Sequence, residues 1–339
     1  MRIGVDVMGG DNAPGAILEG ALGSLDKLGP GDDLVLVGDE RIINAGVGKV
    51  RVPSHVKITV VGTTEVVAMD ESPVEAVRTK PGSSIVVLCK LASRKAEHPL
   101  DAVISAGSTG AQVTAAQMHM RRLPNVHRPG IAVAVPTFAG PVVLIDVGAN
   151  IEPKPHHLAQ YGVMGDVYAR CVLGMPNPRV ALMNVGGEEQ KGTAEMKEAR
   201  DRLRAVEDLN FIGYVEGRGV FNGEADVVIT DGVVGNVMIK LAEGLSAGIF
   251  KALAREVHKI DPHLAARLEP VVKSIYAKHD YHEYGGAPLL GVNGVCIISH
   301  GSSIARTITN AILRCKQFHE SGCNEAMSQR LGAMEEIPA

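Results

Sequence analysis

The stretch VDVMGGDNAPG, residues 5–15, begins as a buried strand and then breaks into two glycines, an acid, an amide and a proline. The same order of strand, glycine corner and helical spacing recurs along the chain. This repetition is typical of parallel strands joined by helical crossovers, and it predicts a three-layer α/β/α protein with a mostly parallel sheet. Such sheets bind ligands beyond the carboxyl ends of their strands, so we expect the function to lie in the glycine corners.

Two sets of segments carry this prediction. Strands are expected at residues 2–8, 33–38, 55–62, 101–107, 131–136, 142–148, 179–187, 210–217, 225–232 and 294–301. Helices are expected at residues 14–28, 109–123, 155–174 and 191–206. We predict a single domain over residues 1–320 and a peripheral tail over residues 321–339, in which a final short helix is an alternative.

Composition narrows the class of protein. The chain is 45% hydrophobic but only 3% aromatic, so its core must be aliphatic, as in buried parallel sheets. Lysine and arginine number 34 against 38 acidic residues, and the absence of a basic tract argues against nucleic acid as a partner. The five scattered cysteines form no C-x-x-C pair, which is typical of free thiols in a reducing cytosol. Without a signal peptide or an apolar run approaching ~18 residues, we expect a soluble cytoplasmic protein.

Residues 233–280 depart from the rhythm of strand and helix. Their spacing predicts a long helical hairpin, because Asp261 and Pro262 suit the cap and first turn of a second helix. Such an arm has little sheet to cover, so we expect it to pack against a second copy of the chain in a homodimer. Its apolar and basic positions are also compatible with peripheral contact to a membrane surface. These positions are Leu245, Ile249, Phe250, Leu253, Lys251, Arg255 and Lys259.

Two corners resemble each other. Residues 101–111 read DAVISAGSTGA and residues 226–236 read DVVITDGVVGN, and both place two glycines between a strand and a helix. We interpret them as equivalent corners that face one cleft, although any tight strand-to-helix corner favours glycine. A helix that begins after a glycine turn offers unpaired N–H groups and partial positive charge to a phosphate or oxyanion. Further corners of this kind lie at residues 9–12, 148–150 and 186–192.

The usual catalytic motifs are missing. The sequence holds no Walker loop, no G-x-G-x-x-G after the first strand, no G-x-S-x-G and no H-E-x-x-H, so we expect neither a nucleotide cofactor, nor a covalent enzyme intermediate, nor a metal. His156 and His157 point about 100° apart on a helix and are interpreted as structural. Lys191 follows a strand and a glycine pair, where its ammonium could face the anion site. It could equally be a solvated lysine paired with Glu188 or Glu195.

Seven blocks in order give the chain a specific resemblance. VDVMGGDNAPG, ISAGSTGA, LIDVGAN, MNVGGEEQKG, GYVEG, ADVVITDGVVGN and YGGAPLLGVNG…HG resemble the PlsX family of acyl-acyl-carrier-protein:phosphate acyltransferases, from residue 3 to about residue 310. The resemblance implies transfer of a fatty acyl group from acyl carrier protein to inorganic phosphate. The product, acyl phosphate, would feed a membrane-bound glycerol-phosphate acyltransferase in phospholipid synthesis. It also implies a homodimer without cofactor, with a fold similar to isocitrate and isopropylmalate dehydrogenases and to phosphotransacetylase.

The resemblance also assigns residues. It links Lys191 and Asn236 to activity. In the mechanism that we infer from this, Lys191 and backbone N–H groups would hold phosphate, and the Asn236 amide would stabilise the oxyanion of the tetrahedral intermediate. The corners supply the predicted substrate-binding residues Gly9, Gly10, Asp11, Asn12, Gly107, Ser108, Thr109, Asn150 and Gly192. One departure is Tyr214, because the family often has asparagine at that position.

The carrier and the rival functions remain open at this stage. Acyl carrier proteins are acidic, so a basic patch should receive the carrier, and Arg121, Arg122, Arg128 or the arm lysines are possible docking positions. A hydroxyacid dehydrogenase of related fold would need an acidic metal site and nucleotide-facing residues, which we do not find. A non-catalytic membrane-associated scaffold for lipid enzymes is the alternative of another class.

Overall fold

A computed structural model describes residues 1–137, 139–278 and 285–334. The strands are β1 (Arg2–Asp6), β2 (Asp33–Gly38), β3 (Lys57–Gly62), β4 (Ala102–Ser105), β5 (Gly130–Thr137), β6 (Gly140–Ile145), β7 (Val180–Met183), β8 (Phe211–Val215), β9 (Val227–Ile229), β10 (Ala287–Leu290) and β11 (Val295–Ile298). The helices are α1 (Gly15–Leu22), α2 (Glu40–Val47), α3 (Pro73–Thr79), α4 (Ser84–Leu91), α5 (Thr109–Ala115), α6 (Pro155–Cys171), α7 (Ala194–Arg204), α8 (Gly217–Phe221), α9 (Gly232–Ile260), α10 (Pro262–Lys278), α11 (Ala305–Glu320) and α12 (Cys323–Met334). Short turns of other helix types are η1 (Leu25–Lys27) and η2 (Ala116–Met120).

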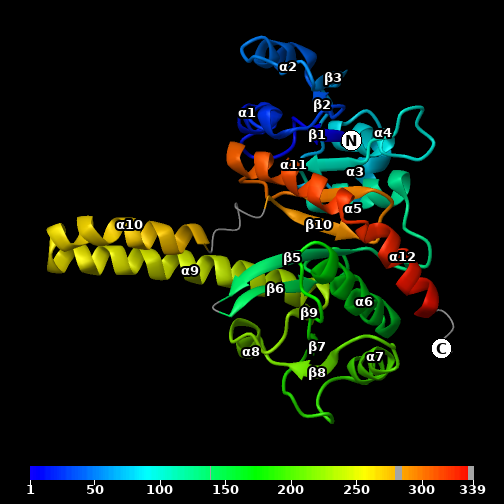
Figure 1. The fold of residues 1–339 in the computed structure, drawn as a ribbon, viewed down its shortest axis with the longest axis vertical. Coiled ribbons are helices and arrows are strands. Elements are labelled where there is room, and N and C mark those ends of the chain that lie inside the picture. Colours follow the sequence, from blue (N-terminus) through cyan, green and yellow to red (C-terminus); the bar gives the residue numbers. More distant parts are fainter. Residues whose placement is uncertain (138, 279–284, 335–339) are drawn as a thin grey trace.

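The strands form one 11-stranded sheet in the order β3-β2-β1-β4-β11-β10-β5-β6-β9-β7-β8. The first five and the last four of these strands pair in parallel, and β10 and β5 join the two blocks through antiparallel pairs. The two parallel blocks therefore run in opposite directions. Figure 1 shows β3 and β8, the two edge strands, at opposite ends of the molecule.

The register of the middle strands brings the carboxyl ends of both blocks to one level. Ile298, the last residue of β11, pairs with Ala287 at the start of β10. Two residues further along β10, Leu289 pairs with Ile131 of β5. The next residue of β5, Ala132, pairs with Ile145, the last residue of β6. Glycine corners from both blocks thus flank the same central pair of strands.

Helices cover both faces of the sheet, which confirms the three-layer prediction. One core cluster joins the sheet to α1, α6, α7, α11 and α12, and the other joins it to α3, α4, α5 and η2. The first turns of α9 lie on the same face as α5, because Met238 and Ile239 pack against the second cluster. The core is aliphatic, as the composition required.

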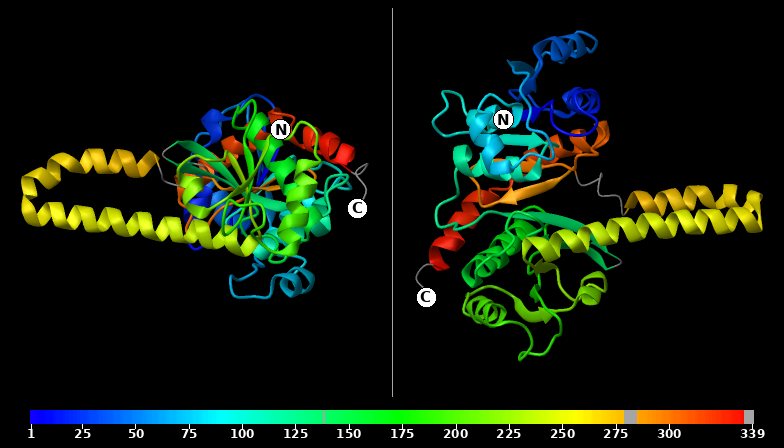
Figure 2. Two further views of the ribbon diagram at one scale, coloured as in Figure 1. Left: turned by 90° about the horizontal axis from the view of Figure 1, so that it is seen from below. Right: turned by 180° about the vertical axis from the view of Figure 1, so that it is seen from behind.

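The predicted hairpin is confirmed over the described residues, and positions 279–280 of the predicted arm lie outside them. The Asp231 carboxylate begins α9 by accepting from the amides of Val233 and Val234. The 29 residues of α9 span about 44 Å, and Figures 1 and 2 show α9 and α10 projecting together from the sheet. Among the described helices, α9 alone is long and apolar enough, by length and composition, to cross a membrane.

Three local features differ from the sequence expectations. The APLL segment, residues 287–290, forms β10. This strand was not predicted, because its apolar run is only four residues long. The helix expected at residues 109–123 changes to a wider turn over η2 and ends at Arg121, whose φ is +70°. The segment predicted as a peripheral tail contains α12, which buries Cys323, Met327 and Leu331, so the packed unit extends beyond residue 320. Residues 335–339 of that segment lie outside the described part.

Candidate active site

A cavity of about 490 Å³ lies between the beginning of α5 and the first turns of α9, over the central strand β5. We call it the α9 cavity. Its polar and glycine lining includes Asp11, Gly107, Thr109, Gly148, Asn236, Lys240, Glu243 and His300. Its apolar lining includes Met69, Ile131, Val133, Ile239, Ala287 and Ile298. A cavity lined by both apolar and polar groups fits a substrate that is partly fatty and partly anionic.

Close packing of two glycine corners forms one wall. A Cβ on Gly9 would lie 2.8 Å from the Gly107 amide nitrogen, so only glycine lets the two corners approach this closely. Asp6 lies beneath them and accepts from the Ser105 hydroxyl, while the Ser105 oxygen in turn accepts from the Gly107 amide. Burial raises the pKa of Asp6 above its usual value, against the hydrogen bonds that lower it.

A second buried carboxylate organises the opposite wall. Asp146 follows β6 and accepts from the backbone amides of Gly148, Ala149 and Asn150, and from that of Ile131 on β5. Burial raises the pKa of this carboxyl as well, with the hydrogen bonds acting in the opposite direction. The backbone of residues 148–150 is therefore held in place by the Asp146 carboxylate.

The start of α9 is pressed against this second corner. A Cβ on Gly235 would lie 2.1 Å from the Asp146 carbonyl oxygen, so glycine is required for the helix to approach. This approach places Asn236 at the cavity. Lys240 lies one turn further along the helix, with its Nζ 2.6 Å from Nε2 of His300 and 3.2 Å from the Glu243 carboxylate.

The structure brings together four of the predicted site residues in the α9 cavity: Asp11, Gly107, Thr109 and Asn236. They come from three different corners, including the two that the sequence paired. Gly9 and Gly10 lie just behind, where Gly10 has a φ of +108°.

Other predicted residues build the site rather than line it. The Asn12 side chain donates to the carbonyls of Ser302 and Ser303, and so ties the first corner to the loop before α11. Ser108 caps α5 by accepting from the Ala111 amide. The Asn150 side chain donates to the Pro129 carbonyl at 2.7 Å.

Lys191 and Gly192 lie in the loop between β7 and α7. Because β7 pairs in parallel with β9, this loop emerges at the same edge of the sheet as the corner that carries Asn236. Lys191 is exposed and does not line the α9 cavity. Gly192, with a φ of +87°, packs against the amide of Asn184. The catalytic role of Lys191 stays a prediction.

Four residues of the site escaped the sequence argument. Asp6 and Asp146 are single acids at strand ends, and burial alone distinguishes them from solvated ones. Lys240 and His300 come from distant segments. One signal was available, because Lys240 lies four residues after Asn236 and therefore on the same face of a helix.

Tyr214, where the family often has asparagine, makes one contact of its own. Its ring lies under the Arg200 guanidinium, with the Arg200 carbon 5.9 Å from the ring centroid, a distance at which a cation–π contact forms. The residue is in β8, which β9 and β7 separate from β6, and it does not line the α9 cavity. No cluster of three or more potential metal ligands of the His, Cys, Asp and Glu types occurs among the described residues.

The fold defines a class of proteins. A phosphotransacetylase from Streptococcus pyogenes superposes with a TM-score of 0.61 at 16% identity, over 94% of each chain. A phosphotransacetylase from Staphylococcus aureus gives a TM-score of 0.58 at 16% identity, over 95% of this chain and 94% of the other. The architecture is therefore phosphotransacetylase-like.

Sequence relatives specify the family within that class. The profile of the family described as fatty acid synthesis protein matches residues 1–326. A phosphate acyltransferase of Desulfitobacterium hafniense is 46% identical over 98% of both chains, and one of Moorella thermoacetica is 43% identical over 99% of this chain and 97% of its own. The chain belongs to this family, for which the sequence blocks were the first indication, and it is an acyltransferase.

Proposed function

We infer that this acyltransferase transfers a fatty acyl group from the thioester of acyl carrier protein to inorganic phosphate, and so supplies acyl phosphate for phospholipid synthesis. The relatives match this chain over nearly their whole length and are named phosphate acyltransferases. Their names support phosphate as the acceptor and acyl transfer as the reaction. One structural observation supports the place of the chemistry: glycine corners from separate parts of the chain meet the Asn236 amide and the Lys240 ammonium of α9 in the α9 cavity.

In the reaction a phosphate oxygen attacks the thioester carbonyl. The new C–O bond forms, negative charge collects on the carbonyl oxygen, and collapse of this intermediate breaks the C–S bond to release the carrier thiolate, which takes up a proton. Phosphate is already anionic, so orientation and charge compensation are sufficient for it to act as the nucleophile. The amide of Asn236 is the donor that we assign to the carbonyl oxygen.

Charge compensation requires a cation beside the phosphate. Lys240 lines the same cavity as Asn236, and we assign it this role together with the N–H groups of the glycine corners. Glu243 and His300 fix the direction of the ammonium through their contacts. Lys191 is the second candidate; it would need a movement of the glycine-rich loop after β7 to reach the cavity.

The direct test is product formation by the purified protein. Incubation with acyl-acyl carrier protein and inorganic phosphate should yield acyl phosphate, trapped as the hydroxamate, together with one equivalent of free carrier thiol. Omission of phosphate should leave the thioester intact. Thiol release that is independent of phosphate would identify a thioesterase, and the absence of turnover with every chain length would contradict the function.

We also propose that the arm joins two copies of the chain and that its outer surface contacts the cytoplasmic side of a membrane. The support is a stripe of exposed apolar side chains spaced every four residues along α9: Leu241, Leu245, Ile249 and Leu253 are 46–65% exposed. A regular stripe of this size is normally covered by a partner. Membrane contact would deliver the reactive acyl phosphate to a membrane-bound glycerol-phosphate acyltransferase.

Acidic substitutions in the apolar stripe of α9 test the dimer and the membrane contact separately. The Leu245→Glu/Ile249→Glu variant should sediment as a monomer, because two buried carboxylates would face their copies in the partner. Flotation with phosphatidylglycerol vesicles measures membrane contact independently. A dimeric variant that no longer floats would assign the stripe to lipid alone, and unchanged behaviour in both assays would contradict both proposals.

A further inference from the structure

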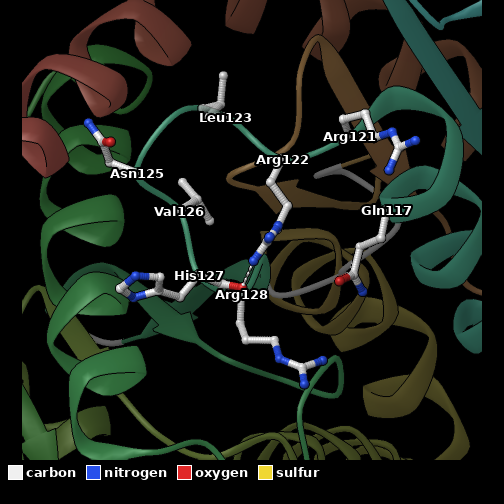
Figure 3. A pocket seen from close by; sticks show the side chains of 8 residues that line it. All are labelled: Gln117, Arg121, Arg122, Leu123, Asn125, Val126, His127 and Arg128. Carbon is white, nitrogen blue, oxygen red and sulfur yellow. Dashed lines mark hydrogen bonds between the residues drawn. The ribbon is translucent and has the colours of Figure 1, made fainter.

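A second hollow lies at the far end of η2 from the beginning of α5. It has a volume of about 580 Å³ and is lined by Gln117, by Arg121, Arg122 and Arg128, and by the loop residues between them. We call it the arginine pocket (Figure 3). None of the eight residues that line it is acidic, although the chain as a whole carries a net charge of −4. A concentration of positive charge on an acidic protein marks a surface for an anionic partner.

Most of the polar side chains that line this hollow point into it. Figure 3 shows Gln117, Arg121, Arg122 and Arg128 around one space, whereas the His127 ring points away toward α6. Arg122 donates to the His127 carbonyl oxygen, which holds its guanidinium in place. Arg121 and Arg128 form no ion pair with any residue in the described part of the chain. Two guanidinium groups are thus available to a ligand.

The loop that carries these arginines is held in a set shape. Arg121 and Asn125 have φ values of +70° and +66°, in a region that side-chain-bearing residues seldom adopt. The buried side chain of Gln160 on α6 accepts from the His127 amide at 2.9 Å and donates to the Asn125 carbonyl at 2.7 Å. Because these hydrogen bonds hold the loop in backbone conformations that are unfavourable on their own, the arginine side chains start from a preorganised backbone.

The arginine pocket is connected to the α9 cavity by a short piece of chain. Ile131 lines the cavity and follows Arg128 by three residues, which can span at most about 10 Å of backbone. Between them, the Pro129 carbonyl accepts from the Asn150 side chain, and so ties the pocket to the corner beside Asn236. A ligand seated on the arginines is therefore close enough to deliver a group into the cavity.

We propose that the arginine pocket is the docking surface for acyl carrier protein, which places acidic side chains on Arg121 and Arg128 while its prosthetic arm carries the thioester into the α9 cavity. This proposal rests on the proposed function and specifies how its macromolecular substrate is recognised. Charge complementarity carries it: the carrier is acidic, and the pocket joins unpaired guanidinium groups to the cavity. Arm residues Lys251 and Arg255 are the rival docking position, at a distance along the projecting hairpin.

The test reverses charge at the pocket without changing the cavity. The Arg121→Glu/Arg128→Glu variant should raise KM for acyl-acyl carrier protein ~10-fold or more at low salt, with kcat nearly unchanged, because rim charges act mainly on encounter. The salt dependence of kcat/KM should flatten in parallel. With a fatty acyl-pantetheine thioester, which lacks the carrier protein, variant and native enzyme should react equally, which also shows that the variant is folded.

Matched variants decide between positions. Arg41→Glu/Arg51→Glu makes the same change in net charge in and after α2, far from both sites, and should leave KM unchanged. A KM effect confined to Lys251→Glu/Arg255→Glu would overturn the proposal in favour of the arm. Equal KM values for the native and pocket variants would overturn it as well, and loss of vesicle binding without a change in KM would assign the pocket to anionic lipid. A native enzyme inactive with every thioester would instead contradict the proposed function.

Discussion

The two corner systems of this enzyme reach the same cavity by different physical means. In the first, Gly9 lies against Gly107, and Asp6 joins two strands through the Ser105 hydroxyl. In the second, Asp146 gathers four backbone amides onto one carboxylate, including that of Ile131 on the neighbouring strand. Both corners hold a buried acid, but the first closes through contact between two glycines, whereas the loop of the second is held by its backbone amides on one carboxylate. This difference predicts which substitutions each can tolerate.

Removal of the two carboxylates should show the largest contrast. Asp146→Ala leaves several buried amides without an acceptor, and we expect a loss of about 4 kcal/mol in unfolding free energy; Asp6→Ala, whose partners include a hydroxyl that can turn to other acceptors, should cost about 2 kcal/mol. Urea denaturation at pH 7 measures both. Equal losses would remove the distinction between the corners.

Replacement of one glycine in each corner should give the opposite order of stability losses. Gly9→Ala should lower the unfolding free energy more than Gly148→Ala, because a Cβ on Gly148 meets no atom within 4 Å, although the φ of Gly148 is +141°.

A second contrast concerns chemistry rather than stability. Asn236 on the second side of the cavity is assigned to the oxyanion, whereas Thr109 on the first side only lines the wall. Asn236→Ala should therefore lower kcat by ~100-fold, the usual effect of losing one oxyanion donor, and Thr109→Ala by far less. Single-turnover formation of acyl phosphate measures the step directly. A similar loss in both variants would place the carbonyl oxygen elsewhere in the cavity.

The comparison also explains what the sequence could predict. Glycine corners repeat in the sequence, so the α/β fold and the pairing of the Gly107 and Asn236 corners could be predicted. The helical arm could be predicted from its long helical spacing. The acids beneath the corners could not, because Asp6 and Asp146 look like any acid at a strand end until burial is known. The same limit applies to His300, which reaches Lys240 only through the order of strands in the sheet. Proximity between distant segments is a property of topology and register, not of a local pattern.

The two candidate lysines offer a smaller and sharper distinction. Lys240→Ala should raise KM for phosphate about tenfold, because a cation beside the anion is lost from the cavity itself. The family resemblance links Lys191 to activity, and Lys191→Ala should lower kcat if the loop after β7 brings its ammonium to the intermediate. Steady-state kinetics with varied phosphate separates the two effects. Near-normal kinetics in Lys191→Ala would remove that residue from the mechanism, and a normal phosphate KM in Lys240→Ala would do the same for Lys240.

The helices that follow the corners differ in their response to pH, which gives the smallest expected effect. Ser108 caps α5 with a hydroxyl that does not titrate, whereas at the start of α6 Nδ1 of His157 accepts from the Lys154 amide. Burial, followed by neighbouring positive charges, lowers the pKa of His157 to about 4 from its usual value of 6.5. The folded state thus favours the neutral ring, so its contribution to stability is complete above pH 6.5 and is lost as the pH falls toward 4.

Replacement of each cap turns this difference into a measurement. His157→Asn keeps an acceptor for the Lys154 amide but does not titrate, so its unfolding free energy should fall less than that of the native enzyme between pH 7 and pH 4.5. Ser108→Ala should instead lose about 1 kcal/mol at every pH, because a neutral cap is removed. Urea denaturation across this range records both slopes. If the unfolding free energies of the native enzyme and of His157→Asn fell in parallel with pH, protonation of the His157 ring would not destabilise the protein. The pH dependence of stability would then come from carboxyl groups.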